Sequence, residues 1–203
     1  MKKFSLLLTV AFLSFTAFSE ALPSRVRIDI DGRKQHIKLR DVTTSVNLKN
    51  QRLKWLKETQ QGEYLTVESG NLTDQWQKFE ISFTPETSGA VRLLVRGNWT
   101  KKDPVRFVAY DNFSFTGFKS LNPDFEVTKN NIISGWALRD FNMCIGQADA
   151  ASGKNYVKCT HDFYIYQNMH VTAGQKATLT FYVRAAESAP RPAKVPYKYE
   201  RMK

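Results

Sequence analysis

Apolar and polar residues alternate with a period of two along much of the chain. The clearest runs place apolar residues at Val26, Ile28 and Ile30, at Phe79, Ile81 and Phe83, and at Leu179, Phe181 and Val183. This alternation predicts β-strands that turn one face toward a core and the other toward water. Turn sequences such as Asp31-Gly32 and Ser88-Gly89 separate the runs, and no long amphipathic helix is indicated. We therefore predict an all-β fold, an antiparallel β-sandwich or jelly roll.

Residues 1–19 have the organisation of a secretory signal peptide. Two lysines precede a mostly apolar run that is too short to span a bilayer comfortably. Small residues allow cleavage after Ser19 or after Ala21, and an uncleaved membrane anchor is the alternative. The mature chain is therefore expected to be secreted, periplasmic or at the cell surface, without spanning the membrane. The paired lysines at the start are typical of a bacterial signal.

The mature chain divides near residue 118. Residues 24–118 predict a β-sandwich unit, and residues 119–186 predict a second, partial jelly-roll unit with fewer strands. Residues 187–203 contain prolines among basic residues and have little to bury, so a basic tail is expected there.

Charge and motifs narrow the classes of function. The 203 residues include 30 Lys and Arg against 19 Asp and Glu, a formal net charge of +11, which favours acidic partners. The basic residues concentrate only in the tail, and export argues against nucleic acid, so no nucleic-acid binding is expected. No phosphate-binding glycine loop, nucleophile–histidine motif or recognisable pair of catalytic carboxylates occurs, so the chain is not expected to be an enzyme.

Cys144 and Cys159 are the two cysteines of the chain. In an oxidising compartment they are expected to form a disulfide, which stabilises by about 3 kcal/mol where the geometry permits. The alternative is two unpaired thiols on neighbouring strands. Neither cysteine has a second cysteine or a histidine at suitable spacing, so zinc binding is not expected.

An aromatic stripe supplies the candidate binding site. Tyr164 and Tyr166 lie two residues apart in a predicted strand and share a face with Asn168, while Trp99 lies in a predicted loop. Aromatic rings stack on the apolar C–H face of a pyranose, and amides pair with its hydroxyl groups. The stripe predicts a platform for a glycan. The alternative is a pair of tyrosines on an inner face of the sandwich.

Short motifs follow one another in a characteristic order in the second part of the chain. The sequence reads NPDFE at residues 122–126, ISGW at 133–136 and YQNMHVTAGQ at 166–175, ahead of a long strand. These segments resemble the first half of a carbohydrate-binding module with the galactose-binding-like jelly-roll fold. Residues 75–85, 91–96 and 108–115 resemble its second half. The resemblance implies a polysaccharide or glycan as the partner.

The resemblance also implies roles for three further residues. Gln167 matches a position that often faces the ligand groove, although strand alternation places it with the inward-facing Ile165. Glu126 and Asp111 match two carboxylates that hold a structural calcium ion in many such modules, with backbone carbonyls as further ligands. The alternative is that both are ordinary carboxylates at strand ends. No other cofactor is expected.

The two matching halves stand in reverse order, which leaves two organisations open. The preferred interpretation is two modules in tandem, the second incomplete. The alternative is one circularly permuted module, in which residues 119–186 complete the sheets of residues 24–118 and Glu126 can meet Asp111. We predict a secreted, non-catalytic carbohydrate-binding protein. The alternative function is a structural or protein-interaction module of the cell envelope, with an envelope protein as partner.

Overall fold

The computed structural model describes residues 24–45, 52–59, 62–69, 72–101, 103–130, 132–138 and 144–193, without the side chains of residues 45, 52–59, 69 and 144. The predicted signal peptide, residues 1–19, lies outside the described residues, and so does the greater part of the predicted tail, residues 187–203.

Strands make up most of the described chain. They are β1 (Val26–Asp31), β2 (Leu39–Ser45), β3 (Arg52–Thr59), β4 (Gly62–Ser69), β5 (Gln77–Pro85), β6 (Gly89–Arg96), β7 (Val105–Thr116), β8 (Thr128–Lys129), β9 (Ile132–Ile133), β10 (Ala137–Leu138), β11 (Cys144–Gly146), β12 (Tyr156–Cys159), β13 (Ile165–Val171) and β14 (Ala177–Ala189). A short 3-10 turn, η1 (Arg33–Gln35), joins β1 to β2. In the part of the chain that the structure describes, no helix has the length and apolar character needed to cross a membrane.

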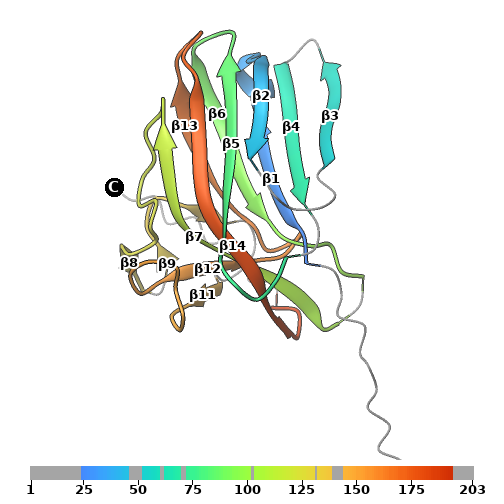
Figure 1. The fold of residues 1–203 in the computed structure, drawn as a ribbon, viewed down its shortest axis with the longest axis vertical. Coiled ribbons are helices and arrows are strands. Elements are labelled where there is room, and N and C mark those ends of the chain that lie inside the picture. Colours follow the sequence, from blue (N-terminus) through green and yellow to red (C-terminus); the bar gives the residue numbers. More distant parts are fainter. Residues whose placement is uncertain are drawn as a thin grey trace, which may run out of the picture.

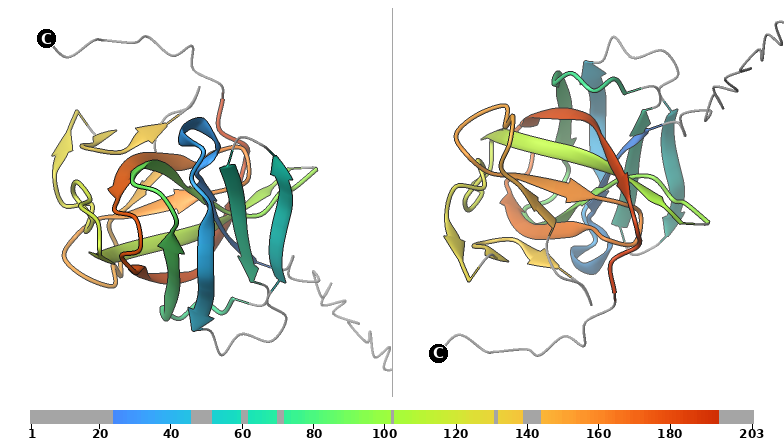
Figure 2. Two further views of the ribbon diagram at one scale, coloured as in Figure 1. Left: turned by 90° about the horizontal axis from the view of Figure 1, so that it is seen from above. Right: turned by 90° about the horizontal axis from the view of Figure 1, so that it is seen from below.

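Two six-stranded sheets pack against each other, seen from the front in Figure 1 and from above and below in Figure 2. Sheet A has the strand order β10-β13-β6-β1-β4-β3, and sheet B has the order β11-β12-β7-β14-β5-β2. Strands β8 and β9 form a separate ribbon. The paired strands run antiparallel throughout, from β1 with β4 to β8 with β9. The predicted all-β antiparallel sandwich is therefore confirmed.

Strands from both predicted units are mixed within each sheet. In sheet A, β13 pairs with β6 from Ile165 opposite Val95 to Val171 opposite Gly89. In sheet B, β14 lies between β7 and β5 and pairs with both. Residues 119–186 thus complete the sheets of residues 24–118. This differs from the tandem interpretation and corresponds to the permuted one, because the pairing partners of β13 and β14 lie in the earlier segment.

The alternation read from the sequence builds the core between the sheets. Ile28, Leu65, Phe79, Ile81 and Phe181 are all fully buried in one continuous cluster. The Phe79 and Phe181 rings stack with centroids 5.0 Å apart. Burying each apolar side chain of this size contributes about 1.5–3 kcal/mol, so the interlocked faces account for most of what holds the layers together.

The two cysteines lie near each other in sheet B. Cys159 is buried at the end of β12, and the register pairs Cys144 of β11 with Lys158. No disulfide is found in the described part of the structure, and the Cys144 side chain lies outside that part. The Cys144–Cys159 disulfide therefore stays a prediction.

Candidate functional site

The outer face of sheet A is rich in arginine because of the alternation in β6. Val91, Leu93 and Val95 are buried in the core, which places Arg92 and Arg96 on the opposite face. The neighbouring strand β13 alternates in the same way, with Ile165, Gln167 and Met169 buried and Tyr166 and Asn168 turned outward. The tyrosine stripe predicted from the sequence consequently lies beside the two arginines.

Each tyrosine of the stripe is covered by one arginine. The Arg96 guanidinium carbon lies 4.0 Å from the centroid of the Tyr164 ring, and that of Arg92 lies 4.8 Å from the Tyr166 ring. Arg92 Nε donates a hydrogen bond of 3.1 Å to Oδ1 of the exposed Asn168. Such cation–π contacts contribute about 0.5–2 kcal/mol each. We call these five residues the Tyr–Arg row. Its two rings are half-buried and are held in place before any ligand arrives.

A buried carboxylate in β1 organises the arginines. Asp29 is 0% exposed, and its oxygens lie 3.1 Å from Arg27 Nε and 2.9 Å from Arg96 Nε. Thr66 Oγ1 donates a third contact to it, at 2.8 Å. Burial and the negative charge of Asp29 raise the pKa of Tyr64 to about 12. Asp29 therefore pairs with two guanidinium groups and fixes the one that covers Tyr164.

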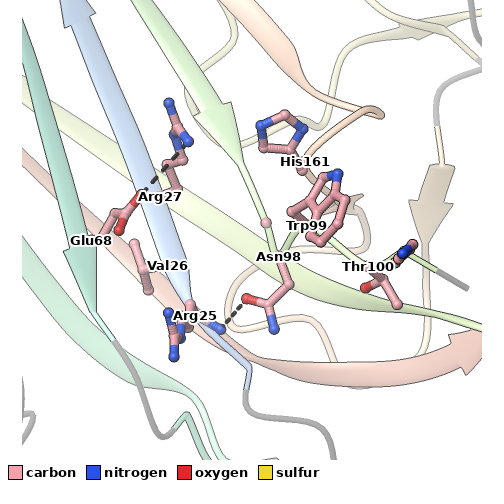
Figure 3. Close-up of a pocket in the computed structure, with 10 residues that line it drawn as sticks. Arg25, Val26, Arg27, Glu68, Asn98, Trp99, Thr100 and His161 are labelled. Carbon is pink, nitrogen blue, oxygen red and sulfur yellow. Dashed lines mark hydrogen bonds and ion pairs between the residues drawn. The ribbon is translucent and has the colours of Figure 1, made fainter.

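A pocket opens at the end of sheet A where β6 leads into β7 (Figure 3). It has a volume of about 390 Å³ and is lined by residues 25–27, Glu68, residues 97–101 and His161. Trp99, which the sequence places in a loop, lies at this pocket and is 64% exposed. The pocket therefore combines an exposed indole with several basic side chains.

The pocket and the Tyr–Arg row are parts of one surface. Arg27 lines the pocket and also contacts Asp29, which in turn holds Arg96 over Tyr164. On the loop side, the His161 backbone N–H donates a 2.8 Å hydrogen bond to the Asn98 carbonyl. Glycine at position 97 permits this approach, because a Cβ there would collide with backbone atoms of Cys159. The structure thus brings Trp99 to the same end of the sheet as the stripe.

Gln167 lies away from this surface. It is 6% exposed and points to the inner side of β13, as strand alternation predicts. Its Oε1 accepts from Ser120 Oγ and from the Leu121 N–H, and its Nε2 donates to the carbonyls of Leu121 and Gly135. These bonds hold the segment after β7 against β13. Because they engage both ends of the amide on the inner side, Gln167 cannot contact a ligand on the outer face.

Asp111 and Glu126 meet at the loop of residues 149–155. Asp111 Oδ2 accepts a 3.0 Å hydrogen bond from the Ser152 N–H, and Glu126 Oε1 accepts from the Lys154 and Asn155 N–H groups at 2.8 Å. Burial, opposed by these backbone hydrogen bonds and assisted by the charge of Glu126, raises the pKa of Asp111 to about 6.

A cation would relieve the unfavourable charge of this pair, so the two carboxylates fit a calcium ion in chemistry. Calcium takes about six to eight oxygen ligands, and carbonyls or water would have to supply the rest. Among the described residues, no group of three or more His, Cys, Asp or Glu side chains is placed to hold a metal ion.

The sequence reading missed the arginines of the Tyr–Arg row and the buried Asp29. A signal for Arg92 and Arg96 was present, because they alternate with Val91, Leu93 and Val95 in the printed sequence. Nothing local marks Asp29 as the partner of both Arg27 and Arg96, since that depends on the order in which strands pair.

Comparisons with protein-family models, curated proteins and solved structures return no match to this chain. The resemblance to carbohydrate-binding modules therefore depends on the short motifs alone. The geometry of the Tyr–Arg row and the adjoining pocket is the remaining indication of the protein's function.

Proposed function

We propose that the protein is a secreted, non-catalytic carbohydrate-binding protein that holds a glycan on the outer face of sheet A. The Tyr–Arg row and Trp99 form the site. The observation that carries the proposal is the row itself, in which two half-buried tyrosine rings are held by guanidinium groups on a sheet face. Rings of this kind stack on the C–H face of a sugar, while Arg and Asn donors pair with its hydroxyl groups. The pattern of residues 1–19 supports export to the periplasm or the cell surface.

The acidic groups of this face support binding rather than hydrolysis. Asp29 is enclosed between two guanidinium groups, and Glu68 pairs with Arg27. Although burial favours its neutral form, hydrogen bonds from Arg33 lower the pKa of Asp31. Glycoside hydrolysis needs one carboxyl group that keeps its proton near neutral pH and a second that attacks or activates water. Carboxylates engaged in this way are suited to positioning arginines.

Calcium and the disulfide belong to the same proposal as structural supports. Asp111 and Glu126 are the residues that would hold a calcium ion, and the ion would neutralise two carboxylates and stabilise the loop of residues 149–155. No cofactor is needed for sugar binding itself. A Cys144–Cys159 disulfide would fix β11 to the end of β12. Titration of free thiols in the unfolded protein shows directly whether this disulfide is present.

Affinity electrophoresis of the purified mature chain through gels that contain single polysaccharides tests the function. We expect retardation by at least one polysaccharide, and Tyr164→Ala and Tyr166→Ala should each weaken it about tenfold. Tyr182→Ala is the matched control, because Tyr182 is a half-buried tyrosine on β14 in the other sheet. A folded wild-type chain retained by no polysaccharide would contradict the proposal, as would equal loss in the control.

One observation favours the alternative of an envelope protein-interaction module. Leu121, Val127 and Ile132 are 66%, 59% and 55% exposed, and two of them lie directly before β8 and at the start of β9. Exposed apolar side chains of this kind can contribute to a protein contact. Under this alternative, Ile132→Ser would abolish co-purification of an envelope protein and leave the tyrosine variants without effect. The two functions are therefore separated by which set of substitutions changes binding.

A further inference from the structure

The pocket beside the Tyr–Arg row has an excess of positive charge. Arg25, Arg27 and Lys101 line it together with one carboxylate, Glu68, which lies 3.6 Å from Arg27 Nη1. Arg27 also pairs with the buried Asp29, so its charge is compensated. Arg25 and Lys101 are exposed, and neither has a carboxylate partner within the described residues. Two cations without a carboxylate partner among the described residues therefore line a single small cavity.

The same pocket offers a flat surface for a ring. Trp99 is 64% exposed and lines the cavity together with His161, whose side chain is drawn next to the indole in Figure 3. The volume of about 390 Å³ lies at the small end of the range for ligand sites, about 300–1,000 Å³. An exposed indole face matches the C–H face of a pyranose. The pocket is therefore sized for about one sugar unit beyond those on the tyrosines.

We propose that this pocket takes an anionic pyranose, a sugar ring that carries a carboxylate or a sulfate group. The ring stacks on Trp99, and Arg25 and Lys101 bind the anionic group. Hydrogen bonds between a cationic donor and an oxyanion are roughly twice as strong as neutral ones, so an acidic unit gains more here than a neutral one. The inference rests on the proposed function and names its substrate class, an acidic polysaccharide.

The test is isothermal titration calorimetry of the mature chain at physiological salt, where contacts between distant exposed charges are screened. The probes are three galactose-based oligosaccharides of equal length, one with carboxylate groups, one sulfated and one neutral. Polyglutamate is a polyanion without a sugar ring. We expect at least one acidic oligosaccharide to bind about tenfold more tightly than the neutral one, and the one that does so identifies the anionic group.

Paired variants separate the pocket from general charge. Arg25→Gln with Lys101→Gln should remove the preference for the acidic oligosaccharide, and Trp99→Ala should weaken its binding about tenfold. The control is Lys129→Gln with Lys176→Gln, which lowers the net charge equally at two exposed positions outside the pocket. The control should keep the preference.

Each other outcome overturns the inference in a distinguishable way. If polyglutamate bound as tightly as the acidic oligosaccharide, net charge alone would attract the ligand. The same would follow if the control pair lost the preference as fully as the Arg25 and Lys101 pair. Equal binding of neutral and acidic oligosaccharides would end the inference and leave the proposed function standing. Binding of none of the three oligosaccharides would end the inference, and retention of the chain by some polysaccharide in affinity electrophoresis would then leave the proposed function standing.

Discussion

Each sheet carries a cluster of aromatic and arginine side chains on its outer face, and the two clusters differ in what covers them. On sheet A, the rings of the Tyr–Arg row are half-buried beside an open pocket. On sheet B, Arg184 lies 4.9 Å from the Trp76 ring and 5.3 Å from the Tyr156 ring. Tyr156 is only 5% exposed, and Trp76 Nε1 donates to the Asp149 carbonyl of the loop that lies over it.

The comparison shows that residue type alone does not distinguish a binding platform from packing. Both faces place arginine over aromatic rings, at 4.0 and 4.8 Å on sheet A and at 4.9 and 5.3 Å on sheet B. The loop of residues 149–155, held by Asp111 and Glu126, closes the cluster of sheet B and makes it a second small core. The rings of the Tyr–Arg row are only half-buried, so the parts of them that Arg92 and Arg96 leave uncovered remain available to a ligand.

Removal of one ring from each cluster gives the largest expected effects. Tyr156→Ala should lower the free energy of unfolding by about 3–5 kcal/mol, because it opens a cavity in the closed cluster of sheet B. The glycan affinity of the Tyr156→Ala variant should be unchanged. Tyr166→Ala should cost about 1 kcal/mol or less, since its ring is only half-buried. Urea denaturation measures both, and equal losses of stability would contradict the distinction between the two faces.

Asp29→Asn tests the support of the open cluster. The substitution leaves Arg27 and Arg96 without their shared charge partner, which should cost about 1–3 kcal/mol. It should also weaken glycan binding, because Arg96 no longer holds Tyr164 in place. Asp31→Asn is the control, since the Arg33 partner of Asp31 is 46% exposed and such pairs contribute about 0–1 kcal/mol. Unaltered glycan affinity in Asp29→Asn would contradict the positioning role.

Features that depend on side-chain alternation could be predicted from the sequence, whereas contacts that depend on the order of strands in the sheets could not. Period two predicted the sandwich, the buried faces of β1, β5 and β14, and the shared face of Tyr164 and Tyr166. It also placed Gln167 on the inner side, against the expectation from the resemblance. Alternation says nothing about which strands become neighbours.

Strand order brings together residues that are far apart in the sequence. The meeting of Asp29 with Arg96 requires β1 to pair with β6, and the contact of Asp111 with Ser152 requires a loop from the second predicted unit to reach β7. These long-range contacts depend on the whole topology, which no local pattern in the chain contains.

Calcium should act on the closed cluster rather than on the open one. If Asp111 and Glu126 hold the ion, added calcium raises the unfolding temperature, because a ligand that binds only the folded state stabilises it. Glu126→Gln should remove that increase and leave glycan affinity unchanged. Differential scanning calorimetry in calcium and in a chelator gives the comparison. Identical unfolding temperatures in the wild type would show that the pair binds only the loop backbone.

The smallest expected effect is a pH dependence of stability from Asp111 in the presence of a chelator. Its pKa in the folded protein is raised from 3.8 to about 6, so between these values the folded state binds more protons than the unfolded state. Its contribution to stability is therefore fully present below about pH 4 and declines as the pH rises to about 6.

Other carboxylates change stability with pH in the opposite direction, so their contribution must be removed by comparison with a variant that keeps them. Although burial opposes ionisation, contacts with His161 and Arg191 lower the pKa of Asp162, and Lys158 lowers that of Glu187. Their stabilisation is present above their unfolded pKa values and is lost as the pH falls. Urea denaturation of wild type and Asp111→Asn over this pH range gives the contribution of Asp111 as the difference between the two free energies of unfolding. A difference that does not change with pH would show that Asp111 is already ionised throughout, as expected if the loop amides alone neutralise its charge.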